Sequence, residues 1–215
     1  MAAVPSVPAE QFEDAEQQRE ASSFGMWVFL ITEIMFFGGL FLSYTIYRVI
    51  YTEAFADASR HLDLTLGTIN TAVLICSSFT MALAVHSAQT GRRRLLMTFL
   101  LATMIIGLVF LTIKFTEWSH EIDDNLVPGH GFIYPGPYTQ PAKLFFSLYF
   151  LMTGVHGLHV FIGVCVLAVL FVLAWRNHFS PQYHTPIEVF GLYWHFVDIV
   201  WLFLYPLLYL IDVYR

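Results

Sequence analysis

Two ionisable side chains, an imidazole and a carboxylate, stand inside an apolar run long enough to cross a bilayer. His195 and Asp198 are three positions apart, so on a helix they share a face. Ionisable groups at membrane depth are costly, and they usually face protein, pair with one another and mark a function. We therefore expect this face to be buried in protein and the opposite face to meet lipid or a larger apolar partner. The opposite face carries Trp194, Val197, Trp201 and Leu208.

A second carboxylate, Glu33, lies in the apolar run T-E-I-M-F-F-G-G, where its own helix offers it only Thr32 and backbone groups. A buried carboxylate either takes up a proton or finds a partner on another helix. Two interpretations follow: a carboxylate hydrogen-bonded across a helix interface, or one that handles protons or modulates a neighbouring chain. Glu33, His195 and Asp198 together form the predicted buried polar site that modulates proton movement.

Histidines near the membrane interior raise the question of haem or copper, because neutral imidazole is the commonest transition-metal ligand. His156 and His159 are three apart, but no carboxylate of an H-E-x-x-H or E-x-x-H motif accompanies them. We therefore predict that this chain holds no metal and no haem. Both histidines, and Asn70 on a stripe of small and hydroxylated residues, are expected to contact other helices or lipid.

Near the end of another apolar run, Lys114 and Glu117 are three apart and can form an ion pair. Trp118 beside them suits a membrane interface. A structural salt bridge is the main interpretation, and a contact to a partner subunit is the alternative. Cys76 and Cys165 lie singly in apolar runs, so we predict small buried hydrophobes without a disulfide.

The composition identifies the elements that must position these groups. Of 215 residues, 57% are hydrophobic and 12% are charged, whereas a soluble domain carries about 25% charged residues. The chain is therefore expected to be an all-α, polytopic membrane protein with a bundle of five transmembrane helices. Each apolar stretch reaches the length of about 20 residues that a spanning helix needs. The stretches lie near 24–47, 64–89, 95–117, 144–175 and 188–212.

Two segments are predicted to lie in water. Residues 1–23 are acidic and have no apolar run, so we expect an aqueous tail, with room for a short amphipathic helix at its end, before a transmembrane domain of residues 24–215. Residues 119–143 are rich in proline, glycine and acidic residues, which predicts an ordered surface loop. The net charge of −6 gathers at these aqueous edges and indicates no nucleic-acid partner.

Basic residues set the predicted orientation. On the side of the membrane that holds the second connection we expect five basic residues, and on the other side four. They are Arg19, Arg92, Arg93, Arg94 and Arg176, against Arg48, Arg60, Lys143 and Arg215. We therefore expect a cytoplasmic N-terminus and a periplasmic C-terminus in a bacterial-type inner membrane.

Depth along the helices brings the ionisable groups to similar levels. At 1.5 Å per residue, Glu33 and His195 come about 13 and 12 Å along their spans, which run the same way. His156 comes out near the bilayer middle, and His159 follows one turn further in. These four residues and Asp198 are therefore expected to share one polar seam in the inner half and midplane of the membrane.

Several sequence blocks carry a family resemblance. The most specific are T-G-V-H-G-L-H-V at 153–160 and Y-W-H-F-V-D-I-V-W-L-F-L-Y at 193–205. The others are G-M-W-V-F-L-I-T-E-I-M-F-F-G-G-L-F at 25–41, N-T at 70–71 followed by S-S-F-T, and K-x-x-E-W at 114–118. In this order, and spread over residues 24–212, the blocks make the chain similar to subunit III of the haem–copper cytochrome c oxidases.

The resemblance implies a non-catalytic accessory subunit of a proton-pumping oxidase in aerobic electron transport. It implies that haem and copper belong to partner subunits, and that this chain lies against the catalytic subunit I, where it supports proton uptake and the durability of the active site. It also implies phospholipid held in a cleft between helices. Glu33 matches the family's intramembrane glutamate. The family's polar positions in the last two helices are matched by His156, His159, His195 and Asp198.

The mitochondrial members of that family have seven helices, and the first two have no counterpart in this sequence. Five-helix forms occur in bacterial oxidases, including the quinol-oxidising branch, and accessory proteins of nitric oxide reductases look similar. Both alternatives stay open, as does membership of a respiratory supercomplex. From different classes, a stand-alone proton or solute carrier would also need buried Glu, Asp and His, and a haem-binding membrane enzyme would show a Soret band.

Overall fold

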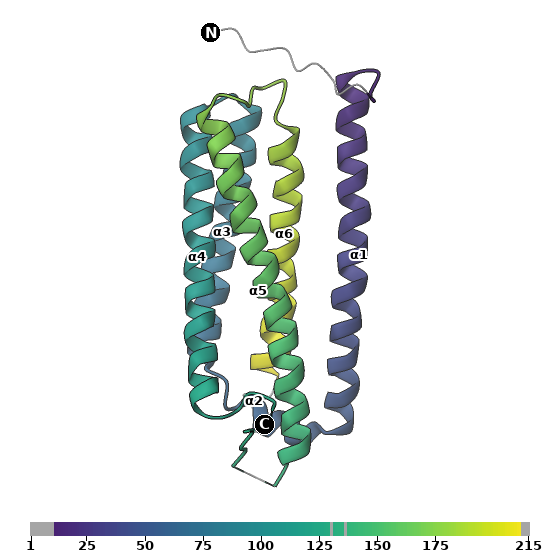
Figure 1. Ribbon diagram of the computed structural model, residues 1–215, viewed down its shortest axis with the longest axis vertical. Coiled ribbons are helices and arrows are strands. Elements are labelled where there is room, and N and C mark those ends of the chain that lie inside the picture. Colours follow the sequence, from purple (N-terminus) through teal and green to yellow (C-terminus); the bar gives the residue numbers. More distant parts are fainter. Residues whose placement is uncertain (1–10, 130, 136, 212–215) are drawn as a thin grey trace.

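The computed structural model describes residues 11–129, 131–135 and 137–211, and they form a bundle of long helices (Figure 1). Five of these helices are long and apolar enough to cross a membrane, which confirms the predicted all-α class. The helices are α1 (Ala15–Ile50), α2 (Thr52–Ser59), α3 (Leu64–Gln89), α4 (Arg93–Asp123), α5 (Thr139–Trp175) and α6 (Thr185–Tyr205), and a π-helical turn, η1 (Pro206–Leu210), continues α6.

Helix ends differ from the predicted ones where capping groups, rather than hydropathy, decide them. The Asp14 carboxylate accepts a hydrogen bond from the backbone N–H of Gln17 at 2.7 Å and starts α1 inside the predicted tail. Residues 1–10 of that tail, and residues 212–215, lie outside the described residues. The helix α4 continues past residue 119 to Asp123, and Asn125 ends it in the left-handed conformation at φ 58°. The predicted loop 119–143 is therefore shorter than its composition suggested.

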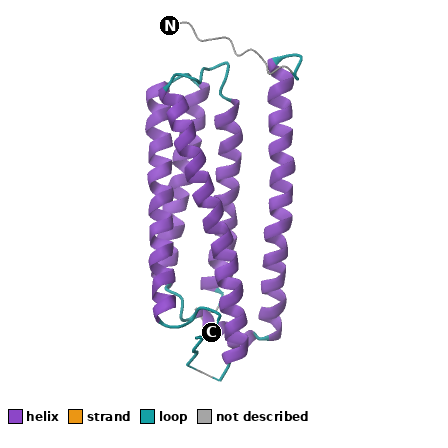
Figure 2. Ribbon diagram, in the orientation of Figure 1, coloured by secondary structure: helices purple, strands orange, loops and turns teal. Residues whose placement is uncertain are grey.

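The helices α3, α4, α5 and α6 pack together, and α1 lies to one side of them, against α5 and α6 (Figures 1 and 2). Only 11% of the apolar window of α1 is buried, against 61% for the span formed by α6 and η1. The short helix α2, which the sequence did not predict, lies at the end of the bundle where α1 ends and α3 begins. We call this end the α2 end.

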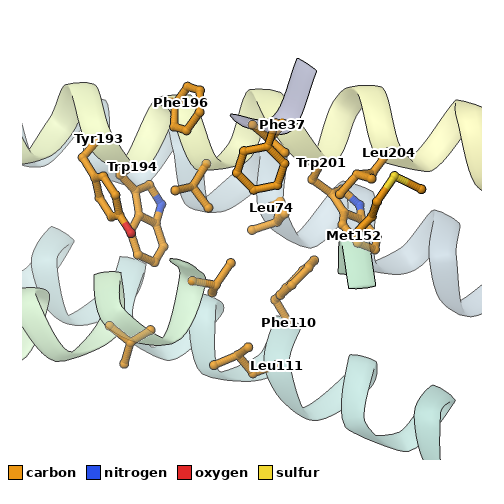
Figure 3. Packing of buried hydrophobic residues seen from close by; sticks show 14 of the residues in the cluster. Phe37, Leu74, Phe110, Leu111, Met152, Tyr193, Trp194, Phe196, Trp201 and Leu204 are labelled. Carbon is orange, nitrogen blue, oxygen red and sulfur yellow. The ribbon is translucent and has the colours of Figure 1, made fainter. Parts of the chain in front are cut away.

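The indoles of α6 point into the bundle, as Figure 3 shows for Trp194 and Trp201. The prediction that their face meets lipid or a larger apolar partner is wrong, because Trp194, Val197, Trp201 and Leu208 are all buried within this chain. Each indole N–H has a partner on α3: Trp194 donates to Ser77 Oγ and Trp201 to Thr71 Oγ1, both at 3.0 Å. The exposed large apolar residues of α6 are instead Ile199, Leu202 and Phe203.

The orientation of α6 was predicted wrongly because both faces of a membrane helix are apolar, so hydrophobicity does not show which face is buried. Lipid tails are as apolar as a protein core, so packing is decided by shape and by hydrogen bonds. A β-carbon at Gly163 would stand 2.7 Å from the Trp194 ring, so this glycine leaves the space that the indole fills. For the same reason Cys76 and Cys165, predicted to be buried, are exposed on the outside of the bundle.

Tyrosines fix the proline-rich loop at the α2 end. The Tyr134 hydroxyl donates to Asp57 Oδ2 at 2.7 Å, and the Tyr138 hydroxyl donates to Glu53 Oε2 at 2.8 Å. Both acceptors lie on α2. The short helix therefore holds the loop between α4 and α5 over this end of the bundle.

Candidate functional site

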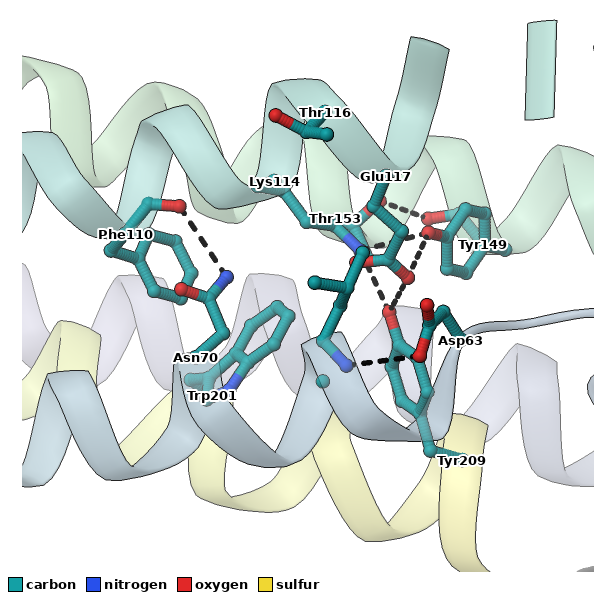
Figure 4. Close-up of polar contacts among 12 residues, drawn as sticks. Asp63, Asn70, Phe110, Lys114, Thr116, Glu117, Tyr149, Thr153, Trp201 and Tyr209 are labelled. Atoms are coloured by element: carbon teal, nitrogen blue, oxygen red, sulfur yellow. Dashed lines mark hydrogen bonds and ion pairs between the residues drawn. The ribbon is translucent and has the colours of Figure 1, made fainter. Parts of the chain in front are cut away.

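The most completely bonded polar cluster lies where α4, α5 and η1 meet (Figure 4). The ammonium of Lys114 donates to Glu117 Oε2 at 3.0 Å and to the hydroxyls of Tyr149 and Tyr209 at 2.8 Å each. Both tyrosine hydroxyls donate in turn to Glu117 Oε1. We call these four residues the Lys114 network. Lys114 and Glu117, predicted to pair, are each only 2% exposed, so the ion pair lies inside the protein and not at its interface with water.

All three ammonium protons and both carboxylate oxygens of this network have partners. A buried charge is tolerated when it is paired and its remaining hydrogen-bonding groups are satisfied. Tyr149 and Tyr209 were not predicted, because a tyrosine in an apolar run gives no sign of where its hydroxyl points. The network therefore joins three helical segments, and a role in chemistry is not needed to explain it.

Glu33 has its partner on α5. Its Oε2 lies 3.2 Å from His159 Nε2, and the two side chains are 19% and 14% exposed. His159 Nδ1 lies 2.8 Å from the carbonyl oxygen of Val155, and the Tyr193 hydroxyl donates to the carbonyl of His159 at 2.9 Å. This pair ties α1 to α5, and a second bond, from the Tyr44 hydroxyl to the carbonyl of Leu207 at 3.0 Å, ties α1 to η1.

The geometry of His159 constrains the protons of this pair. A carbonyl oxygen only accepts, so Nδ1 must carry a hydrogen. The bond between Nε2 and Glu33 then needs one further proton, held either by the carboxyl of Glu33 or by the imidazole. The neutral pair and the ion pair therefore contain the same number of protons, and one proton can shift between them along a single hydrogen bond.

His195 and Asp198 lie between α6 and α3. His195 Nδ1 lies 2.8 Å from Ser78 Oγ. Asp198 is 5% exposed, and neither of its carboxylate oxygens has a hydrogen-bond partner among the described residues. Ser78, which bonds His195, is also the hydroxyl that faces Asp198. The two residues share a face of α6, as their spacing predicted, but no described hydrogen bond joins them.

His156 and Asn70 lie wholly inside the bundle. The imidazole of His156 packs against Phe110 and Trp201, with ring centroids 5.5 and 5.2 Å away, and its nitrogens have no described partner. Asn70 Nδ2 donates to the carbonyl of Phe110 at 3.4 Å. Of the lipid and interhelix contacts expected for these two residues, only the interhelix ones are made, because neither side chain reaches the surface.

The five residues expected in one polar seam thus fall into three separate sets. Glu33 pairs with His159, His195 and Asp198 lie at Ser78, and His156 stands among aromatic rings. Position along a helix fixes the depth of a residue but leaves its rotation about the axis open. The expected Glu33–His195–Asp198 region is therefore not one hydrogen-bonded cluster, because Glu33 bonds His159 and His195 bonds Ser78.

A groove separates α1 from α6 and has a volume of about 510 Å³. Its lining is almost entirely apolar, and His195 is its one ionisable residue. Each of the two helices contributes six residues to it. From α1 they are Trp27, Leu30, Ile34, Phe37, Gly38 and Phe41, and from α6 they are Leu192, His195, Phe196, Ile199, Val200 and Phe203. We call this the α1–α6 groove.

The described residues contain no group of three or more His, Cys, Asp or Glu side chains that could together hold a metal ion. The histidines are spread over separate contacts, as the sets above show. The described polar groups of the membrane interior thus join helices to one another, and one of them, the His195 imidazole, lines the apolar groove.

Comparison with known proteins identifies the family. The family model for cytochrome c oxidase subunit III matches residues 13–213. The chain is 34% identical over 191 residues to cytochrome c oxidase subunit 3 of Thermostichus vulcanus, covering 87% of this chain and 86% of the relative. It is 31% identical over 198 residues to the subunit 3 of Papio hamadryas, covering 86% and 68%. The chain therefore belongs to the cytochrome c oxidase subunit III family and is part of a cytochrome c oxidase complex.

Proposed function

We propose that this chain is a non-catalytic accessory subunit that packs on the catalytic subunit I, supports proton uptake and active-site durability there, and holds phospholipid. The complex passes electrons from cytochrome c to oxygen, and haem and copper reside in its other subunits. We place it in a bacterial-type inner membrane with a cytoplasmic N-terminus, on the strength of the arginine cluster 92–94.

One observation carries this proposal: α1 stands beside the bundle, tied to α5 by the Glu33–His159 pair, with the α1–α6 groove open next to it. A side chain pair that shares one proton can change its charge distribution without gaining or losing a proton. Near a proton entrance of subunit I it would therefore act on the local hydrogen-bond and lipid environment, rather than serve as a step of the electron chemistry.

The proportions of the groove support lipid as its occupant. Its walls are apolar along about four turns of α1, from Trp27 to Phe41, which suits an acyl chain lying along the helix. The outward side of α1 is also apolar, with Val28, Met35 and Val49 exposed. In the complex this side can meet subunit I or lipid without the loss of any hydrogen bond.

The proton role is tested by Glu33→Gln in the whole oxidase. Gln removes the shared proton but keeps the size of the side chain, so we expect normal assembly, slower proton uptake and fewer turnovers before inactivation. The matched control is Glu188→Gln, because Glu188 also lies 3.2 Å from a histidine, His184, but sits at the start of α6 outside the groove. Unchanged turnover, pumping and lifetime in Glu33→Gln would end this role while leaving the family assignment intact.

The lipid role is tested with two neighbouring glycines of α1. A β-carbon at Gly38 or at Gly39 would meet nothing within 4 Å, but only Gly38 lines the groove. We expect Gly38→Trp to fill the groove and to lower the phospholipid retained by the purified complex, measured by lipid extraction and mass spectrometry. Gly39→Trp should retain the normal amount. Equal lipid content in the two variants would contradict lipid binding in this groove.

A further inference from the structure

A pocket of about 520 Å³ at the α2 end has no part in the function proposed above. It opens between the last turns of α4 and the connection that precedes α3. Its lining is made of five carboxylates and two imidazoles. These are Asp63, Glu117, Glu121, Asp123, Asp124, His61 and His120. We call it the acidic pocket.

The floor of this pocket carries an unpaired carboxylate. Glu121 is 4% exposed, and neither of its oxygens has a hydrogen-bond partner among the described residues. The nearby hydroxyls of Tyr149 and Tyr209 have already given their protons to Glu117, and Lys114 uses all three of its own. The Lys114 network therefore spends its hydrogen bonds on Glu117, and the Lys114 ammonium acts on Glu121 only through the attraction of opposite charges.

The surroundings add further negative charge. Asp63, Asp123 and Asp124 are exposed at the rim, and none of them, nor Glu121, takes part in a described ion pair. The carboxyl end of α4, which points here, carries the partial negative charge of the helix dipole and favours a cation. A carboxylate held out of water in such surroundings needs a counter-charge or a proton.

We infer that the acidic pocket binds one hydrated divalent cation of the hard, oxygen-preferring class, Ca²⁺ or Mg²⁺, with Glu121 as its buried anionic ligand. Zinc needs three or four protein ligands at short distance, and no such group exists among the residues that the structure describes. A hard cation such as Mg²⁺ keeps several of its waters and is held by one or two carboxylates. At about 30 Å³ for each water, the pocket has room for the ion and its shell.

The experiment uses the purified oxidase complex, stripped of loosely held metal with a chelator and titrated with Mn²⁺ as an EPR-visible probe of this class. We expect Glu121→Gln to bind one Mn²⁺ fewer per complex, or to weaken that site about tenfold or more. Ca²⁺ or Mg²⁺ should displace the same ion from the unmodified complex. The control is Glu53→Gln, which removes an equal charge from an exposed position of α2 at the same end but outside the pocket. It should leave the number of bound Mn²⁺ ions unchanged.

Asp124→Asn, a rim variant that leaves the buried residues in place, gives a second reading if Glu121→Gln does not assemble. We expect it to weaken Mn²⁺ binding by a smaller factor. The inference is overturned if the Glu121 variant, or in its absence the Asp124 variant, keeps the full number and affinity of Mn²⁺ sites. Displacement by Zn²⁺ but not by Ca²⁺ or Mg²⁺ would overturn the hard-cation class. None of these outcomes depends on the role of Glu33.

Discussion

The Lys114 network and the Glu33–His159 pair are both ion-pairing groups inside a membrane protein, but they are built differently. Lys114 and Glu117 are buried where three helical segments meet, and every donor and acceptor of their charged groups is used. Glu33 and His159 share a single bond at the edge of a helix that is mostly uncovered. The difference teaches that a saturated network holds several helical segments together, whereas a single bond fastens α1 only lightly to α5.

Lys114→Met would break the saturated network and should have the largest effect on stability. It leaves the Glu117 carboxylate buried without its cation, which costs about 3–5 kcal/mol of unfolding free energy. An SDS titration of the detergent-solubilised protein measures this loss. The double variant Lys114→Met with Glu117→Met should recover most of it, because no charge is left unpaired. Lys143→Met, at a partly exposed lysine that bonds only one described carbonyl, is the control and should be nearly neutral.

Gly163→Ala tests the contrast between tight packing inside the bundle, at Gly163, and open space along α1, at Gly38. The added carbon would stand 2.7 Å from Trp194, and such overpacking costs about 1–3 kcal/mol. Gly38→Ala on α1 meets nothing within 4 Å and should cause no loss. Both are compared by the same SDS titration and by the fluorescence of the indoles. An equal loss in the two variants would contradict the contrast in packing.

Tyr134→Phe tests how firmly the bond to α2 holds the proline-rich loop over the α2 end. The α1–α6 groove, by comparison, has no such cover among the described residues. Removing the bond to Asp57 should loosen the loop by about 1 kcal/mol and raise its cleavage rate by protease. Tyr138→Phe, at the more exposed bond to Glu53, should change cleavage less. If the loop is cut no faster in Tyr134→Phe, the bond does not hold it.

The same bond has a predictable pH dependence. Burial, followed by the bond to Asp57, raises the pKa of the Tyr134 hydroxyl above its ordinary value. A group with a raised folded-state pKa contributes its stabilisation below the unfolded value and loses it only as the pH passes the folded one. Protection of the loop should therefore persist through about pH 10, where an unperturbed tyrosine ionises. Loss of protection well below that pH would contradict the raised pKa.

The coupling of Glu33 and His159 should be the smallest effect on stability. Hydrogen bonds between membrane helices average about 0.6 kcal/mol in double-mutant cycles, and this pair is partly exposed. Glu33→Gln, His159→Gln and the double variant, titrated together, give the coupling energy. A value near that expected for Lys114 and Glu117 would mean that α1 is fastened as firmly as the bundle, and the comparison above would fail.

Hydropathy was sufficient for the five spans, because a run of apolar residues has few alternatives to a membrane helix. It was not sufficient for their ends, which Asp14 and Asn125 decide by capping, or for α2, which is too short to give a periodic signal. The i,i+3 spacing of Lys114 and Glu117 predicted their pairing, but nothing in it indicated that two tyrosines from distant segments complete the network. The spacing of Glu121, four positions after Glu117, places both carboxylates on one face of α4. Only the structure shows that His61 and Asp63, which precede α3, complete the acidic pocket there.

The sequence by itself determined that this chain spans the membrane with five helices, and its motifs carried the family. Only the tertiary structure decided which face of α6 is inside, that Glu33 meets His159 and not His195, and that α1 leaves a groove. The physical reason is that spacing along a helix fixes depth and relative angle, while the rotation of the whole helix depends on which neighbours accept its side chains. In a bilayer, where both sides are apolar, the fit of Trp194 to Gly163 and of its N–H to Ser77 makes that choice.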